Sequence, residues 1–153
     1  MLGTGAGVGR ATNGSGPPRV GVILPDTQTS DRWENADRPL LAAAFEAADV
    51  DYEIRNAEGA AANMATIADQ MITDGVTVLM IVNLDNESGA QIQQRAADAG
   101  IPTIDYDRLT LGGSAAVYVS FDNVQVGVLQ GEGLIECLAD RGVERPAIAV
   151  LNG

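Results

Sequence analysis

Acidic, amide and arginine side chains follow several apolar, strand-like runs of this sequence. The run 103–106 ends in Asp107 and Arg108. Two earlier runs of the same kind end at Asp26 and at Asn83. Because ligands of open α/β sheets bind outside the carboxyl ends of the strands, we expect these ends to meet around a small polar ligand.

The elements that must position these residues alternate between strands and helices. Apolar runs predict strands at residues 20–24, 51–57, 76–82, 103–106, 116–120 and 146–151. Apolar residues at spacings of three and four predict helices from 33 to 48, 63 to 74, 86 to 99 and 122 to 141. Pro39 marks either the start of the first helix or a kink in it. This order favours right-handed βαβ units and an α/β fold, with a doubly wound, mostly parallel, flavodoxin-like sheet.

The apolar spacing also predicts which helix faces point inward. The expected inner faces are Leu40, Leu41, Ala44, Phe45 and Ala48 in the first helix, Met64, Ile67, Ala68, Met71 and Ile72 in the second, and Ala90, Ile92, Ala96 and Ala97 in the third. Cys137 lies among apolar residues of the last helix, so we expect it to be buried as a small hydrophobic side chain.

Composition and charge exclude several classes of function. The 153 residues suffice for one domain, and the net charge of −12 makes nucleic acid and anionic membranes poor partners. The chain has no histidine, which removes the commonest general base and metal ligand. No calcium-loop pattern of carboxylates is present in the sequence, so we expect no metal site.

Nucleotide binding and catalysis are also disfavoured. The first strand is followed by Pro25 and a polar loop, not by a glycine-rich phosphate loop. The glycine-rich stretch 5–9 precedes that strand, so it lacks the context of a dinucleotide motif. With no nucleophile constellation in the sequence either, we expect no enzyme, no catalytic residue and no cofactor.

A set of motifs resembles a known family. The set comprises Asp31-Arg32-Trp33 with Asp37-Arg38 after it, Gly75 to Leu79, Gly100-Ile101-Pro102, Tyr106-Asp107-Arg108, and Tyr118 to Asn123 followed by Val126-Gly127 and Gln130-Gly131. In this order and spacing it is similar to the N-terminal lobe of periplasmic-type sugar-binding proteins, the substrate-binding components of ABC importers. Within that group the similarity is greatest to the D-xylose-binding branch, and it covers residues 19–153.

The resemblance implies a type I periplasmic-binding lobe that works with a second lobe across a hinge. It implies a monosaccharide ligand, a pentose such as D-xylose, held between the lobes without chemistry and delivered to a membrane permease. Residues 1–18 are expected to form a disordered tail or linker, and residues 19–153 the N-terminal lobe, with the second lobe absent from this sequence. The uncovered lobe face then gives an opportunity for self-association.

The resemblance also implies an extracytoplasmic location, either in the periplasm or anchored at the cell surface as a lipoprotein. The first 18 residues are rich in glycine and small polar residues and lack the apolar core of a signal peptide. No targeting segment is therefore visible in the sequence.

By family similarity, ligand-binding roles fall on Arg32, Trp33, Asn83, Asp107 and Arg108. Arg108 presents a planar fork for two oxygens, and Asp107 accepts from hydroxyls and can hold that fork. Asn83 offers a donor and an acceptor. Trp33 can stack on a sugar face while Arg32 reaches the sugar's edge.

Each role has a structural alternative. Trp33 could pack as a staple at the helix start, Asp107 and Arg108 could form a surface ion pair, and Asn83 could make an Asx turn. Asp37 and Arg38 are expected to form a solvated or hinge-side pair, and Asp122 or Asn123 to cap the last helix.

The alternative function is a sugar-sensing effector domain of a receptor or transcriptional regulator. A regulator would normally carry a basic helix-turn-helix before the first strand, where this chain has its glycine-rich tail.

Overall fold

The computed structural model describes residues 17–150, and most of the predicted tail, residues 1–16, lies outside them. The elements are β1 (Arg19–Leu24), the π-helical turn η1 (Trp33–Asp37), α1 (Arg38–Ala47), β2 (Asp51–Asn56), α2 (Ala61–Thr73), β3 (Val78–Ile81), α3 (Asn86–Asp98), β4 (Thr103–Tyr106), β5 (Val117–Val119) and α4 (Asn123–Asp140). Every strand pair is parallel, and the strand order is β2-β1-β3-β4-β5. The predicted parallel α/β sheet is therefore confirmed.

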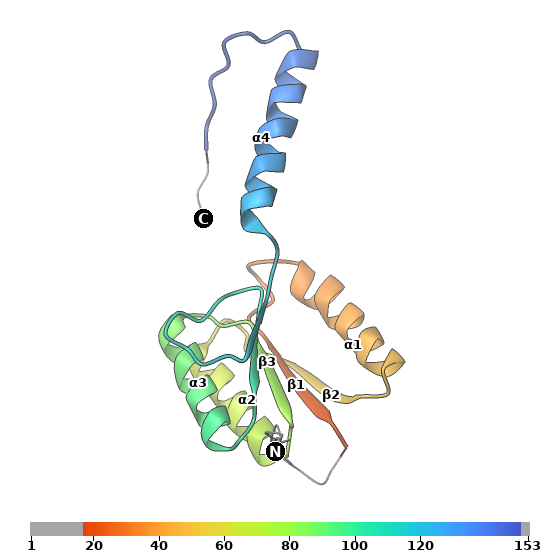
Figure 1. The fold of residues 1–153 in the computed structure, drawn as a ribbon, viewed down its shortest axis with the longest axis vertical. Coiled ribbons are helices and arrows are strands. Elements are labelled where there is room, and N and C mark those ends of the chain that lie inside the picture. The colour runs from red at the N-terminus through yellow and green to blue at the C-terminus, as the bar shows by residue number, and fades with distance from the viewer. Residues whose placement is uncertain (1–16, 151–153) are drawn as a thin grey trace, which may run out of the picture. The chain divides into compact units, whose positions relative to one another are not determined.

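Helices cover both faces of this sheet. Figure 1 shows α1 on one face and α2 with α3 on the other. The strand order reverses between β1 and β3. In open α/β sheets the loops that follow two such strands diverge, and ligands bind in the crevice between them at the carboxyl edge. That edge is where the sequence places its polar strand ends.

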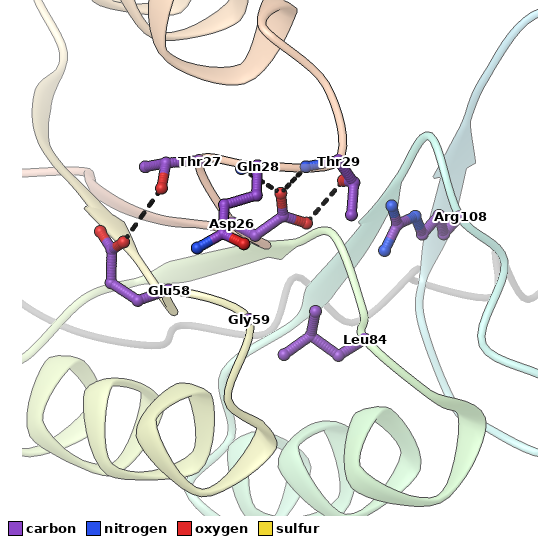
Figure 2. A pocket seen from close by; sticks show the side chains of 8 residues that line it. All are labelled: Asp26, Thr27, Gln28, Thr29, Glu58, Gly59, Leu84 and Arg108. Atoms are coloured by element: carbon purple, nitrogen blue, oxygen red, sulfur yellow. Dashed lines mark hydrogen bonds between the residues drawn. The ribbon is translucent and has the colours of Figure 1, made fainter.

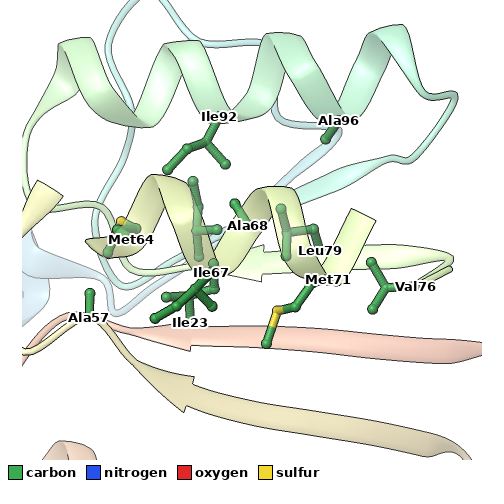
Figure 3. Packing of buried hydrophobic residues seen from close by; sticks show 11 residues of the cluster. Ile23, Ala57, Met64, Ile67, Ala68, Met71, Val76, Leu79, Ile92 and Ala96 are labelled. Carbon is green, nitrogen blue, oxygen red and sulfur yellow. The ribbon is translucent and has the colours of Figure 1, made fainter. Parts of the chain in front are cut away.

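The face under α2 and α3 holds the larger core cluster (Figure 3). It contains Ile23, Ala57, Met64, Ile67, Ala68, Met71, Val76, Leu79, Ile81, Ile92 and Ala96. The four buried residues of α2 were all predicted from helical spacing, and Ile72 packs against the cluster as well. Gly21 makes this contact possible, because a Cβ there would lie only 2.8 Å from Met71 Sδ.

The opposite face carries a smaller cluster of Val22, Leu24, Trp33 and Val82, with Leu41 and Phe45 of α1 partly buried against it. Pro39 lies in the first turn of α1, so the helix begins there and follows the π-helical turn.

The inward face predicted for the first helix is wrong for Leu40, Ala44 and Ala48, which are exposed. Their exposure follows from the position of α1, which packs mainly on the edge strand β2, while Trp33 from the preceding turn fills the space over the central strands.

The prediction for α3 needs a similar correction. Ile92 and Ala96 are buried as expected, but Ala97 is exposed and the polar Gln93 is fully buried. Gln93 can lie at an inner position because its side-chain amide donates to the buried carboxylate of Asp105 in β4. The tertiary fold brings these two polar residues together.

The chain divides into two compact units, residues 1–119 and 120–153. In the second unit Asp122 caps α4, as predicted, and accepts a hydrogen bond from the amide of Gln125. Cys137 is exposed, so its expected burial is wrong. No helix within residues 17–150 is long and apolar enough to cross a membrane.

The strand predicted at residues 146–151 is also wrong, since residues 146–150 have no regular secondary structure and residue 151 lies outside the described part. An apolar run becomes a strand only where a neighbouring strand accepts and donates its backbone hydrogen bonds. Within residues 17–150 the strand pairings involve β1 to β5 alone, and none includes this run.

Candidate ligand-binding site

The loop after β1 is organised by a buried carboxylate. Asp26 is 4% exposed, and its Oδ1 accepts from the backbone amides of Gln28 and Thr29 at 2.8 and 2.6 Å. Its Oδ2 accepts from the Thr29 hydroxyl at 2.7 Å (Figure 2). Burial alone would raise the pKa of Asp26, but these hydrogen bonds, with the nearby charge of Arg108, outweigh burial and lower it. The loop is thus held in one conformation beside the crevice.

This loop forms one wall of an open pocket of about 400 Å³ in the first unit (Figure 2). The pocket is lined by Asp26, Thr27, Gln28, Thr29, Glu58, Gly59, Leu84 and Arg108. Of these lining residues, Arg108 alone belongs to the predicted site. Asp26 could have been included from the sequence, because it is a polar residue at the end of the first strand. Glu58 had no such signal, because it reaches the pocket from a left-handed turn after β2, at φ 53°.

Two residues far apart in sequence, Arg32 and Asp107, form the centre of the predicted site. Arg32 Nη1 donates to Asp107 Oδ1 at 2.9 Å, and Arg32 Nε donates to Asp37 Oδ2 at 2.8 Å. Burial alone would lower the pKa of Arg32, but the bonds to Asp37 and Asp107 outweigh it and raise the pKa. Asp37 was expected in a solvated pair with Arg38, which is wrong, because Arg38 pairs with Glu34 instead.

The backbone at Asp107 is unusual for a residue other than glycine. Its φ is 65°, in the left-handed region, which aspartate tolerates better than most residues. Its amide donates to the carbonyl of Val119 at 2.8 Å, which ties it to the neighbouring strand β5. This left-handed turn follows directly on the end of β4 at Tyr106.

Trp33 lies beneath the arginines of the site. Its side chain is 2% exposed, with the Arg32 guanidinium carbon 4.2 Å and that of Arg108 5.7 Å from the ring centroid. Both distances suit cation–π attraction. The indole Nε1 is buried, and no hydrogen-bond partner for it is found within residues 17–150. Trp33 therefore packs in the core, and its stacking on a ligand stays a prediction.

Asn83 connects the ends of β3 and β4. Its backbone carbonyl accepts from Arg108 Nη1 at 3.1 Å, and its amide nitrogen donates to Thr110 Oγ1 at 2.8 Å. The side-chain bond to a residue far along the chain replaces the Asx turn considered from sequence. All five predicted residues thus come together in the first unit, at the carboxyl edge of the sheet. No group of three or more carboxylate or cysteine side chains within residues 17–150 is arranged to hold a metal ion.

The parallel sheet with helices on both faces makes this an α/β domain whose polar strand ends gather at one edge. Residues 20–153 match the model of the periplasmic binding protein domain, and the chain belongs to that family.

Two curated relatives exceed 30% identity. The multiple sugar-binding periplasmic protein SbpA of Azospirillum brasilense is 34% identical over 79% of this chain and 34% of its own length. The multiple sugar-binding periplasmic receptor ChvE of Rhizobium radiobacter is 33% identical over 78% of this chain and 33% of its own length. The chain thus spans about a third of the length of these relatives.

Solved structures of the same kind agree with this membership. An ABC transporter solute-binding protein from Clostridium phytofermentans with bound β-D-glucose has a TM-score of 0.71 and 28% identity, covering 80% of this chain and 38% of that chain. A carbohydrate transporter solute-binding protein from Chloroflexus aurantiacus in complex with D-glucose has a TM-score of 0.68 and 32% identity, covering 76% of this chain and 34% of that chain.

Proposed function

We propose that this chain is the N-terminal lobe of the solute-binding component of an ABC sugar importer, and that it binds a monosaccharide without catalysing a reaction. The observation that carries the proposal is the contact between Arg32 and Asp107, which places a charged donor and a charged acceptor at the carboxyl edge of the sheet. Arg108, Asn83 and Trp33 lie beside this pair and complete the proposed half-site.

The chemistry of these residues suits a sugar. A monosaccharide carries hydroxyls around its edge, each able to donate and accept, and apolar C–H groups on its faces. The guanidinium groups supply donors and the carboxylate of Asp107 supplies acceptors in charge-assisted hydrogen bonds. Because the Arg32 guanidinium lies over the Trp33 ring, stacking of a sugar on that ring requires Arg32 to swing aside.

D-xylose is the proposed first ligand. The D-xylose-binding periplasmic protein of Escherichia coli is 27% identical over 77% of this chain, which supports a pentose. Relatives in solved structures hold D-glucose, so a hexose is the competing ligand. Delivery to a membrane permease and an extracytoplasmic location, as in these periplasmic relatives, are part of the same proposal.

A second lobe is expected to supply further contacts and to trap the sugar by closing on residues 19–153. Without it, the proposal predicts weak binding and self-association of the uncovered face. The edge strand β5 of the first unit leaves Val117 49% and Tyr118 44% exposed, which supports the second expectation. Analytical ultracentrifugation of the chain at several concentrations measures this self-association.

The binding test compares this chain with the same chain extended by a second lobe. D-xylose and D-glucose are titrated by ¹⁵N NMR, which detects millimolar binding, and by calorimetry for the extended chain. The expected result is weak binding by the chain, tight binding by the extended protein, and loss of both in Arg108→Ala. Arg55→Ala is the matched control, since Arg55 donates to Gln70 on the exposed surface. If neither protein binds any pentose or hexose, the proposal is wrong.

A second candidate is a sugar-sensing domain of a receptor, which the resemblance to the periplasmic receptor of Rhizobium radiobacter favours. Sugar uptake by vesicles that contain a matched permease separates the two. Stimulation of uptake by the extended protein supports the importer, and sugar binding without stimulation supports the sensor.

A further inference from the structure

A buried carboxylate that takes no part in the proposed ligand contacts lies directly behind the site. Asp105 of β4 is 1% exposed and points to the face of the sheet that α3 covers. None of the ion pairs within residues 17–150 includes it. A buried carboxylate without a charged partner is costly unless hydrogen bonds satisfy it, so its partners must account for its presence.

Three donors converge on this carboxylate. Oδ1 accepts from Gln93 Nε2 and from the Thr110 hydroxyl, both at 2.7 Å, and Oδ2 accepts from the Thr110 backbone amide at 2.7 Å. Both oxygens therefore act as acceptors. An asparagine amide would present a donor at one of the two positions and meet another donor there.

The bonds to Thr110 close the loop that carries the proposed ligand contacts. The chain leaves β4 after Tyr106 and returns to the carboxylate of Asp105 through Thr110. Asp107 and Arg108 lie inside this closed loop. Gln93 joins the next segment to the same point, because its Oε1 accepts from the Ser114 amide at 2.6 Å.

The same network orients Asn83. The Thr110 hydroxyl has one proton, which it donates to Asp105, so toward Asn83 it can only accept. The Asn83 amide nitrogen is therefore turned to Thr110, and the amide oxygen stays outside the network. Its backbone carbonyl meanwhile receives Arg108. The hydrogen bond from Thr110 to Asp105 thus sets the orientation of the Asn83 amide.

Two glycines leave the space that this network needs. A Cβ at Gly89 would lie 3.0 Å from Asn83 Cβ and from both Oγ1 and Cγ2 of Thr110. A Cβ at Gly113 would clash with Gln93 Oε1 and lie 2.9 Å from Thr110 Cγ2. A side chain at either glycine would therefore push against the network, so both positions need glycine for this packing.

We propose that Asp105, acting through Thr110 and Gln93, is a positioning residue that holds the 106–110 loop and the Asn83 amide in the geometry of the binding site. The expected effect on sugar affinity rests on the proposed function. The expected effect on the conformation of the 106–110 loop does not rest on it.

The test therefore measures the two separately. Amide hydrogen exchange of the ligand-free chain reports the loop at Asp107 and Thr110, whose amides donate to Val119 O and Asp105 Oδ2. Titration with D-xylose and D-glucose reports binding. The variants are Thr110→Val, which removes the hydroxyl at nearly equal volume, Thr110→Ser, which keeps it, and Asp105→Asn. Thr103→Val is the control, since Thr103 is 3% exposed and two residues earlier on the same face of β4.

The expected result is exchange at the loop faster by about tenfold to a hundredfold in Thr110→Val and Asp105→Asn, the range for a lost hydrogen bond to a charged group. Thr110→Ser and Thr103→Val should leave the loop unchanged. Equal exchange in Thr110→Val and the unmodified chain, or the same increase in Thr103→Val, would overturn the proposal. If the loop responds as expected but the unmodified and extended proteins bind no sugar, the positioning role stands and the proposed function fails.

Discussion

Arg32 and Asp107 are separated by 75 positions in sequence, yet their side chains meet at 2.9 Å across the carboxyl edge of the sheet. Arg32 comes from the loop before the π-helical turn, and Asp107 from the left-handed turn after β4. The contact joins the segment that follows β1 to the turn that follows β4. It therefore depends on the parallel sheet that places the ends of these two strands at the same edge.

Arg32→Lys tests this contact. Lysine keeps the charge but has no planar fork, so it cannot hold Asp37 and Asp107 together as Arg32 does. We expect D-xylose affinity of the extended protein to fall at least about tenfold, with a stability loss below about 1 kcal/mol because the pair is partly exposed. Calorimetry and urea unfolding measure the two effects. Arg55→Lys should change neither, and unchanged affinity in Arg32→Lys would remove Arg32 from the site.

Trp33 should contribute more to stability than any other side chain of its cluster. It is the only tryptophan, is 2% exposed, and fills the face between the sheet and α1. Trp33→Ala should lower the free energy of unfolding by about 3–5 kcal/mol. Leu40→Ala, at a side chain that is 68% exposed, should cost less than about 0.5 kcal/mol. Urea unfolding followed by circular dichroism compares them, and equal costs would contradict the burial of Trp33.

The low pKa of Asp26 predicts a dependence of stability on pH. A carboxylate whose pKa is lower in the folded state contributes stability above its unfolded pKa of about 3.9 and loses it as pH falls through the folded value. Asp26→Asn should therefore be less stable than the unmodified chain at pH 7, and the difference should shrink steadily below about pH 4.

Thr27→Val serves as its control, because the Thr27 hydroxyl donates to Glu58 and not to Asp26. Its stability difference from the unmodified chain should not follow the Asp26→Asn curve. Urea midpoints from pH 2 to pH 7 give both curves. A constant difference for Asp26→Asn over this range would rule out the hydrogen-bonded carboxylate as its cause.

Gly21 tests the packing of α2 on β1. A Cβ there would lie 2.8 Å from Met71 Sδ and 3.2 Å from Val76 Cγ1, both buried. Gly21→Ala should therefore destabilise the chain by about 1–3 kcal/mol through overpacking. Gly131→Ala, in α4, meets no atom within 4 Å and should instead stabilise its helix by about 1 kcal/mol. Thermal unfolding compares the two, and no loss in Gly21→Ala would mean that α2 shifts freely.

Local pattern was sufficient where one helix face meets one core. The spacing of Met64, Ile67, Ala68 and Met71 predicted the buried side of α2, because the helical period brings these residues onto one face wherever the helix packs. It failed for Leu40 and Ala97, whose exposure depends on how much sheet each helix covers. The run at 146–150 failed for a related reason, since strand formation requires a partner that apolar pattern alone cannot supply.

The sequence by itself determined the α/β alternation and the polar residues at the strand ends, because both depend on local period and on the chain's order of elements. Only the tertiary structure decided that Asp107 meets Arg32, that Trp33 is covered by a guanidinium, and that Gln93 is buried against Asp105. Each of these contacts joins different elements. They form only when the order β2-β1-β3-β4-β5 sets the strands side by side, and local pattern contains no information about that order.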